Sequence, residues 1–484
     1  MQLSDSNDSK TGTLSSVGTR LSDLMTPTVR LGVTGLARAG KTVFITALVR
    51  NLIAGGRLPH FSPMAQGRIT RTYLEPQPDD RIPRFAYEEH LAELAGDPPR
   101  WPESTRRISQ LRLTIEYVSA KPLRRTLMPG RLHVDIVDYP GEWLLDLPLL
   151  DLDFGEWSAR SLADARQPHR TQAAKLWLEF LSTLDADRPA DEQVALNGAG
   201  LFTRYLQDAR AIDPALAAPG PGRFLLPGDA AGSPLLTFFP LPPPAVGAYA
   251  HGTLGAMLAR RFDSYKTHMV KPFFRDHFAR LDRQIVLMDA LPAINSGAEA
   301  VADLQHTLEA VLECFRPGAH TWLSRILSRR IDRLLFAATK ADHLHHTSHD
   351  RLEAILRLLA EKAIARAEFA GAEVKVMAVA ALRATREAEA RSGWQRLPCI
   401  VGIPLPGERL GRQVFDGTTE AAVFPGDLPE DPAALKSNAS PRAVHFPRFR
   451  PPRLRLEALA DGTPALPHIR LDRAMDFLLG DWLA

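Results

Sequence analysis

The chain has 484 residues, of which 45% are apolar and 24% charged. This length is too great for one ordinary hydrophobic core, so two or more units are expected, and the composition is typical of a soluble globular protein. Lys and Arg number 59 against 56 Asp and Glu, and a net charge of +3 indicates neither a specific nucleic acid nor another special partner. The two cysteines, Cys314 and Cys399, lack a metal-ligand spacing and indicate a reducing compartment.

Residues 1–25 are rich in Ser, Thr, Asp and Gly and lack an apolar signal core, so we interpret them as a mobile tail. No apolar run in the sequence is long enough to span a bilayer. These features predict a cytoplasmic protein, which reaches the inner membrane only through a partner or an amphipathic surface.

The first strong motif begins at Gly35, ends at Thr42 and reads G-x-x-x-x-G-K-T. It follows a short apolar run at residues 29–33 and opens a helical pattern at residues 44–52, as a phosphate-binding loop requires. Backbone N–H groups and the helix N-terminus would face the phosphates, Lys41 would reach the terminal phosphates, and the Thr42 hydroxyl would ligate Mg²⁺. The residues of this loop predicted to contact nucleotide are Gly35, Ala37, Arg38, Ala39, Gly40, Lys41, Thr42 and Val43.

Several near-continuous apolar runs predict buried parallel strands with helices on both faces of the sheet. The later strands alternate with helical patterns at residues 298–315 and 349–368, which favours a doubly wound α/β sheet. The predicted strands are residues 29–33, 111–117, 132–137, 284–288, 334–338 and 374–380.

The predicted sheet is interrupted between its third and fourth strands. Residues 146–282 hold little strand pattern, and amphipathic helices at 173–184 and 254–281 flank a Pro- and Gly-rich stretch, which indicates a mostly helical insertion. A second insertion is expected at about residues 55–104. The predicted units are a first core part at residues 26–145, a second core part at 283–395, and at 396–484 a Pro- and Arg-rich extended segment with a helix that packs on the core.

The third predicted strand ends in Asp138-Tyr-Pro-Gly141. An Asp at the carboxyl tip of a buried strand can hold Mg²⁺, usually through water, and the Gly141 N–H can approach a γ-phosphate. A switch threonine should precede the second strand, and Thr105 is the best placed, with a simple turn residue as the alternative. The predicted metal ligands are therefore Thr42, Thr105 and Asp138.

The fifth predicted strand ends in Thr339-Lys-Ala-Asp342, one residue away from the N-K-x-D pattern that reads guanine. Asp342 would accept hydrogen bonds from the guanine N1–H and 2-amino group, which adenine does not offer in that arrangement. The Lys340 stem can pack over the base, and Thr339 keeps a hydroxyl for local bracing. Beyond the sixth strand, the Ala381 N–H could donate to guanine O6, with Leu382 beside it.

In this order the motifs resemble the G domain of small P-loop GTPases over residues 28–145 and 283–390. More closely, the motifs G-L-A-R-A-G-K-T, V-D-Y-P-G-E-W and T-K-A-D look like the YcjX family of bacterial GTP-binding stress proteins. That resemblance extends across nearly the whole chain. It implies an α/β fold with a Ras-like P-loop GTPase core and a mostly parallel sheet, interrupted by a large helical insertion, with Mg²⁺ as cofactor and GTP or GDP as ligand. It also implies a stress-response link and an association with the membrane protein YcjF.

Glu142 stands where Ras-type proteins carry a Gln that orients the attacking water. A carboxylate accepts a hydrogen bond from water but repels the γ-phosphate, so slow turnover is expected. The alternative is that Glu142 points away and caps its loop. Arg38 either acts as an arginine finger or is simply solvated. The residues predicted to take part in hydrolysis are Lys41, Thr105, Gly141 and Glu142.

Two function classes follow from these motifs. The first is a slow, Mg²⁺-dependent GTPase switch in a stress response, which converts GTP to GDP and phosphate and signals through the helical insertion. The second is a nucleotide-stabilised scaffold with little turnover. ATPase or kinase activity is disfavoured because the T-K-A-D motif argues for guanine.

Three further features are weaker. The histidines at 343, 345, 346 and 349 show no clear helical face and no carboxylate orienter, so a metal site is not favoured. The basic segment at residues 448–455 is interpreted as an edge strand with outward arginines, with nucleic acid or anionic lipid as the alternative ligand. The apolar face at residues 471–483 predicts a helix that docks onto the sheet.

Overall fold

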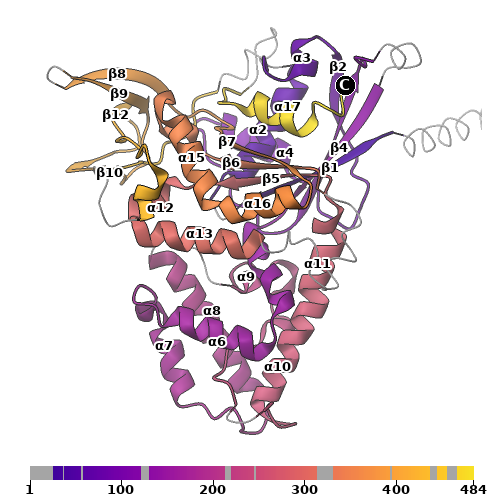
Figure 1. The fold of residues 1–484 in the computed structure, drawn as a ribbon, viewed down its shortest axis with the longest axis vertical. Helices are drawn as coiled ribbons and strands as arrows, with labels where there is room; N and C mark the ends of the chain where they lie inside the picture. Colours follow the sequence, from indigo (N-terminus) through magenta and orange to yellow (C-terminus); the bar gives the residue numbers. More distant parts are fainter. Residues whose placement is uncertain are drawn as a thin grey trace, which may run out of the picture.

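Figure 1 shows a computed structural model of the chain, in which a twisted sheet with flanking helices forms the upper part and a group of helices extends below it. The structure describes residues 26–35, 38–55, 58–121, 130–212, 220–244, 247–312, 331–392, 395–436, 444–454 and 466–484. The predicted tail at residues 1–25, Ala37 of the phosphate loop and Cys314 lie outside these described residues.

Seven strands of the described chain form the main sheet, in the order β2-β3-β4-β1-β5-β6-β7. From β4 to β7 neighbouring strands are parallel, whereas β2 pairs with β3 and β3 with β4 in antiparallel fashion. The strands are β1 Thr28–Gly35, β2 Ile69–Glu75, β3 Ser109–Tyr117, β4 Gly130–Asp138, β5 Arg283–Met288, β6 Arg333–Ala338 and β7 Glu373–Ala378.

All six predicted strands are present, which confirms a mixed α/β fold with a mostly parallel central sheet. The prediction that residues 111–117 form a parallel strand is wrong, because β3 is antiparallel to β4. Its apolar run indicated burial, and burial does not fix strand direction. Strand β2 lies within the region predicted as a second insertion and extends the edge of the sheet.

Alternate residues of the strands divide between two cores, because successive side chains of a strand point to opposite faces. In β5, Ile285 and Leu287 belong to the core shared with α2, α4 and α17, whereas Val286 and Met288 belong to the core shared with α13, α15 and α16. The bounds are α2 Lys41–Ile53, α4 Tyr87–Ala95 and α17 Leu471–Leu479 on one face, and α13 Ala298–Leu312, α15 His349–Leu359 and α16 Glu361–Phe369 on the other.

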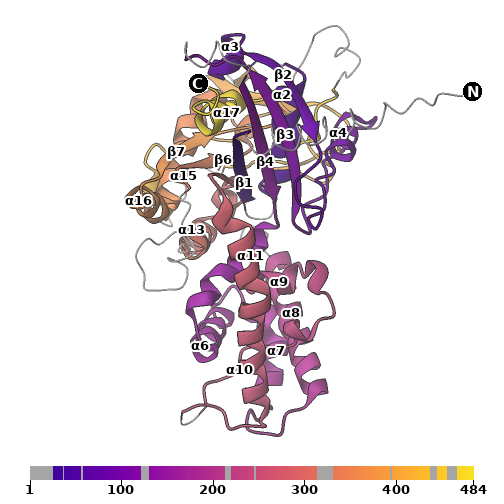
Figure 2. The same ribbon diagram turned by 90° about the vertical axis from the view of Figure 1, so that its right-hand side faces the viewer.

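Residues 141–282, called the helical region below, connect β4 to β5 and form the lower part of the molecule (Figure 2). Its interior is aromatic: Trp157 stacks on Phe262 with ring centroids 4.8 Å apart, and Trp177 stacks on Tyr205 at 5.3 Å. This interior is continuous with the core beneath α13. The elements are η1 Gly141–Asp151, α6 Phe154–Ala165, α7 Thr171–Ser182, α8 Glu192–Ile212, α9 Gly222–Leu225, α10 Leu254–Tyr265 and α11 Lys271–Asp276. The division of the chain into separate units at the predicted boundaries stays a prediction.

The C-terminal part adds a small antiparallel sheet and a docked helix. The small sheet has the order β12-β9-β8. Helix α17 packs on the main sheet, where the buried Arg283 donates to the Leu478 carbonyl at 3.2 Å and to Asp481 at 2.7 Å, so the predicted docking is confirmed. Further bounds are α3 Ser62–Ala65, α12 Leu291–Ser296, η7 Ala341–His343, η8 His346–Ser348, β8 Arg386–Ser392, β9 Gln395–Gly402, β10 Arg409–Leu410, β11 Gln413–Val414, β12 Ala421–Val423 and η9 Pro432–Lys436.

The basic segment does not form the predicted edge strand over its described residues, 448–454. Only one isolated bridge is present, between Pro404 and Phe449. Pro451 and Pro452 lack backbone N–H groups, which prevents a continuous ladder here. Across the described residues, the structure contains no helix of the length and apolar character that a membrane crossing would need.

Candidate nucleotide-binding site

A pocket of about 320 Å³ opens at the carboxyl ends of the parallel strands, where ligands of open α/β sheets bind. Six separate segments line it, and they include most of the residues predicted to contact nucleotide. The lining comprises residues 38–44, 101–105, 339, 340, 342, 343, 379–382, 405, 448 and 449.

The phosphate loop shapes one end of this pocket. Gly40 has a φ of 85°, in the left-handed region that glycine tolerates, and it caps helix α2. The first N–H groups of α2 therefore face the pocket, which creates an anion site. The Lys41 ammonium donates to the Gly35 carbonyl at 3.0 Å, so the side chain folds back across the loop. A Cβ at Gly35 would lie 2.4 Å from the Leu287 carbonyl oxygen, and only glycine fits there.

The three predicted metal ligands gather beside Lys41. The Thr105 hydroxyl donates to Asp138 Oδ2 at 2.6 Å, and the Thr42 hydroxyl donates to the Glu103 carbonyl at 3.3 Å. Burial raises the pKa of the Asp138 carboxyl, and the nearby Lys41 charge and the Thr105 hydrogen bond oppose that rise. Asp138 Oδ1 is buried without a hydrogen-bond partner among the described residues. Hydroxyl and carboxylate oxygens suit Mg²⁺, and an unpaired buried oxygen among them fits a hard cation.

Glu142 is directed away from the pocket. It lies in η1, directly after Gly141, and its carboxylate forms a 2.9 Å ion pair with Arg210 of α8. The Glu142 side chain is only 7% exposed. Neither Gly141 nor Glu142 lines the pocket. Glu142 therefore contacts the helical region. A part for Glu142 in hydrolysis stays a prediction.

Two further contacts fasten η1 to the helical region. The Trp143 indole N–H donates to the Leu226 carbonyl at 3.0 Å, and the Arg223 guanidinium lies 3.5 Å from the Trp143 ring centroid. A buried cation over an aromatic face is a favourable contact. Sequence reasoning did not find Arg210 or Arg223, because nothing local marks a contact between residues so far apart.

Glycine is required at the point where α9 meets η1. The Gly222 N–H donates to Asp146 Oδ1 at 2.7 Å, and both groups are buried. A Cβ at Gly222 would lie 1.7 Å from the Glu142 carbonyl oxygen. The backbone that follows the strand tip of Asp138 is therefore packed directly against the helical region.

Asp342 lines another part of the pocket, called the base end below, and is 4% exposed. The Ala384 N–H donates to Asp342 Oδ2 at 2.8 Å, and the Thr385 hydroxyl donates to the Asp342 carbonyl. Burial raises the pKa of the Asp342 carboxyl to about 6, although the Ala384 hydrogen bond opposes the rise. The carboxylate is thus held in place by the loop after β7, which carries the predicted Ala381 and Leu382.

Thr339 and Lys340, which precede this aspartate in the motif, are braced against the end of β5. The Thr339 hydroxyl donates to the Met288 carbonyl at 3.2 Å, which is the local bracing that the sequence suggested. Lys340 has a φ of 59°, and its ammonium pairs with Asp289. These contacts fix the turn that presents Asp342 to the pocket.

Residues of the C-terminal part close one wall of the pocket, and sequence reasoning did not assign them there. The Trp101 indole N–H donates to the Phe449 carbonyl at 2.7 Å, and both residues line the pocket with Leu405 and Arg448. The Phe449 ring meets His343 edge to face at 5.2 Å. Burial lowers the pKa of His343 to about 3, so this histidine is neutral. The basic segment with an interleaved Phe was the one signal in the sequence that pointed here.

Lys41 at the start of α2 and Asp342 after β6 line one pocket, and their motifs are those of P-loop proteins. The fold and the site therefore define a P-loop protein with a Ras-like α/β core.

The chain belongs to the YcjX-like family, DUF463, which it matches over residues 29–483. It is 39% identical over 468 residues to the "Ras-like GTPase YcjX" of Escherichia coli (strain K12), with 94% of this chain and 96% of the relative covered. It is 34% identical over 485 residues to the "Ras-like GTPase YcjX" of Shewanella oneidensis MR-1, with 94% of each chain covered. The family suggested by the motifs is thus confirmed.

Proposed function

We propose that this chain binds guanine nucleotides with Mg²⁺ in the pocket and hydrolyses GTP slowly to GDP and phosphate. The observation that best supports this proposal is that the phosphate loop and Asp342 line the same cavity. The two relatives described above, which cover nearly all of this chain, are both named Ras-like GTPases, and this supports a GTPase.

The phosphate end supplies charge neutralisation and positioning. Lys41 and the N–H groups at the start of α2 hold the β- and γ-phosphates. Thr42, Thr105 and Asp138 would hold Mg²⁺, which shields the charge that develops on the leaving phosphate. Because Asp138 already accepts a hydrogen bond from Thr105 at 2.6 Å, the switch threonine and the strand tip are positioned together.

The base end supplies selectivity. An ionised Asp342 accepts hydrogen bonds from two adjacent guanine donors. With adenine the buried carboxylate would remain unpaired, which costs free energy. The Ala384 N–H orients this carboxylate before the base arrives.

One observation favours the second candidate, a nucleotide-stabilised scaffold with little turnover. Glu142, the nearest equivalent of a water-orienting residue, is paired with Arg210 at 2.9 Å and turned from the pocket. Slow hydrolysis is expected while that pair persists. Measured phosphate release, compared with nucleotide affinity, separates a slow switch from a scaffold.

The deciding experiment titrates the purified chain with GTP, GDP and ATP, each with Mg²⁺, and then follows phosphate release. GTP and GDP are expected to bind much more tightly than ATP. Asp342→Ala should weaken GDP binding at least about tenfold, or about 1.4 kcal/mol, whereas Asp427→Ala at an exposed position should not. Equal affinity for GTP and ATP in the parent chain would overturn the assignment of guanine.

The switch itself is tested through the helical region. We expect loss of the γ-phosphate to relax the loop at Gly141 and to alter the packing of η1 on α8 and α9. Hydrogen exchange across residues 141–282 should differ between the GDP-bound chain and the chain bound to a non-hydrolysable GTP analogue. Identical protection, with both ligands shown to be bound, would leave the scaffold. The stress-response link and an association with YcjF remain predictions from the family resemblance.

A further inference from the structure

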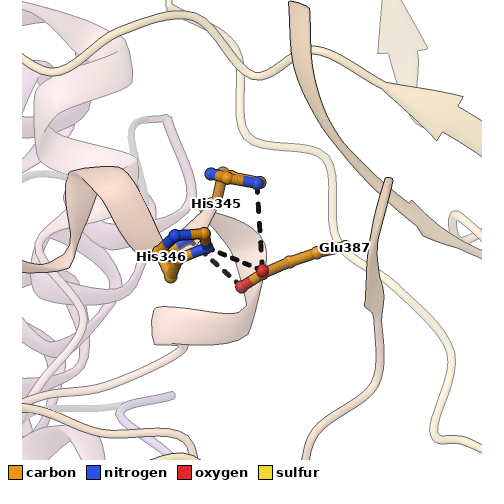
Figure 3. A group of neighbouring side chains, drawn as sticks. All are labelled: His345, His346 and Glu387. Atoms are coloured by element: carbon orange, nitrogen blue, oxygen red, sulfur yellow. Dashed lines mark hydrogen bonds and ion pairs between the residues drawn. The ribbon is translucent and has the colours of Figure 1, made fainter. Parts of the chain in front are cut away.

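A cluster of two histidines and one glutamate lies outside the nucleotide pocket. His345 lies between η7 and η8, His346 is the first residue of η8, and Glu387 lies in β8 (Figure 3). One ligand atom from each residue can be chosen so that all three lie within 4.8 Å of one another. The sequence showed four nearby histidines without an orienting carboxylate. The prediction that these histidines lack an orienting carboxylate is wrong, because Glu387 of β8 lies against His346, although the two residues are 41 positions apart in the sequence.

The distances within the cluster suit a tetrahedral ion. His346 Nδ1 lies 2.8 Å from Glu387 Oε2, and His345 Nε2 lies 3.8 Å from the same oxygen. Around Zn²⁺, with ligand bonds of about 2.0–2.1 Å, neighbouring ligand atoms stand about 3.3–3.4 Å apart. The two observed distances bracket that value, so small side-chain rotations would bring the three atoms into a common coordination sphere.

Each ligand is also oriented by a second contact. His345 Nδ1 lies 3.0 Å from the Thr347 hydroxyl, which leaves Nε2 free to face Glu387. Glu387 Oε1 accepts from the His346 N–H at 3.2 Å and lies 3.7 Å from Arg383, which leaves Oε2 between the two imidazoles. Contacts of this kind fix tautomer and orientation in metal sites.

The cluster is accessible from solvent. The His346 side chain is 64% exposed, so an ion can enter from solvent, and water can complete the coordination. Nitrogen and carboxylate ligands together suit Zn²⁺ and similar divalent transition metals better than Mg²⁺ or Ca²⁺.

We infer that His345, His346 and Glu387 form a binding site for a divalent transition-metal ion of the Zn²⁺ class. A bound ion would join the loop that carries Asp342 to the strand that follows Ala384 and Thr385. Since those residues hold Asp342 in place, the ion would stiffen the base end of the pocket and slow the release of GDP. This last consequence rests on the proposed function, whereas metal binding does not.

The test is a titration of the full-length, metal-free chain with Zn²⁺ against a chromophoric chelator, in the absence of nucleotide. One Zn²⁺ is expected per chain. His346→Ala and Glu387→Gln should each weaken binding at least about tenfold. The matched controls His251→Ala and His268→Ala, at exposed positions outside the cluster, should bind as the parent does.

Co²⁺ provides a second measurement on the same variants. A tetrahedral or five-coordinate nitrogen and oxygen site should give visible absorption that His346→Ala and Glu387→Gln abolish and the control variants keep. Unchanged Zn²⁺ affinity in both cluster variants, or no saturable binding by the parent chain, would overturn the site. If Zn²⁺ binds as expected but GDP release is unchanged, only the link to nucleotide fails.

Discussion

The two ends of the pocket are built in contrasting ways. At the base end, the Asp342 carboxylate already accepts a hydrogen bond from the Ala384 N–H, and Thr339 is braced on Met288. At the phosphate end, Asp138 Oδ1 is buried without a hydrogen-bond partner in the described part of the chain, beside Lys41. At the base end, contacts within the protein already hold the polar groups in place. At the phosphate end, polar groups remain that a cation and phosphates would satisfy.

The two ends of the pocket also differ in the part of the protein that they contact. The base end is bound to the C-terminal part, through the ring contact of His343 with Phe449 and through the bridge between Ala380 and Ile469. The segment that follows Asp138 is bound to the helical region through Glu142 and Trp143. A ligand that changes at its phosphates would therefore act on the helical region, while recognition of the base stays constant. Four predictions sharpen this contrast.

The largest effect is expected at the phosphate end. Lys41→Ala should abolish GTP hydrolysis and weaken GTP binding at least about 100-fold, or about 2.7 kcal/mol, because the proposed site has the ammonium contact the phosphates directly. Calorimetric titration and phosphate release measure both effects. The surface variant Lys175→Ala should leave both unchanged. Parental hydrolysis by Lys41→Ala would show that the phosphate end lies elsewhere.

The contact between η1 and α9 should be the next most sensitive. Gly222→Ala places a Cβ against the Glu142 carbonyl and should lower the free energy of unfolding by about 2–3 kcal/mol. Gly200→Ala, in α8, meets no atom within 4 Å and should be neutral or stabilising. Denaturant unfolding of the three proteins gives the comparison. Equal stability of Gly222→Ala and the parent chain would mean that η1 is not held tightly against α9.

The base end should respond to pH. The pKa of Asp342 is raised to about 6, so its ionised, guanine-binding form is lost as pH falls through that value. Protonation alone predicts GDP binding about tenfold weaker at pH 5 than at pH 7. The phosphates of GDP also titrate near this range. Because Asp342→Asn cannot ionise at this position, the pH dependence of its GDP binding measures the contribution of the phosphates alone. Identical pH profiles for the parent chain and Asp342→Asn would contradict the role given to this carboxylate.

The smallest effect is expected at the wall that joins the two ends. Trp101→Phe removes the indole N–H that donates to the Phe449 carbonyl but keeps an aromatic ring in the pocket. We expect GDP binding to weaken about fivefold, or about 1 kcal/mol, with a larger loss for Trp101→Ala. Stopped-flow release of a fluorescent GDP analogue measures the change. A Trp101→Phe variant with parental kinetics would show that the C-terminal wall is passive.

Most of the phosphate end was predictable because its chemistry is encoded in consecutive residues. The glycine at position 40 and the lysine at 41 must be neighbours for the loop to work, and Asp138 had to end a strand beside β1. Asp342 was predictable for the same reason, as part of a short motif after β6. In each case a short sequence pattern predicts where the functional side chain lies.

What could not be predicted depends on contacts between distant residues. Trp101 and Phe449 are 348 positions apart, and no pattern in either segment predicts a contact with the other. Arg210 reaches Glu142 from a long helix whose sequence shows only amphipathicity. The antiparallel direction of β3 was missed because strand burial and strand direction are separate properties. The contact of Glu387 with the histidines was not predicted either, because it also joins residues that are far apart in the sequence.

The bridge between Ala380 and Ile469 has a consequence for the order of assembly during synthesis. The Arg383 N–H also donates to the Pro467 carbonyl at 2.7 Å, so residues 466–469 support the loop that presents Ala384 to Asp342. A ribosome makes the phosphate loop more than 400 residues before that support. Base recognition therefore cannot be complete until residues 466–469 have been made and have packed against this loop. Guanine selectivity would then be the final property that this protein gains as it is made.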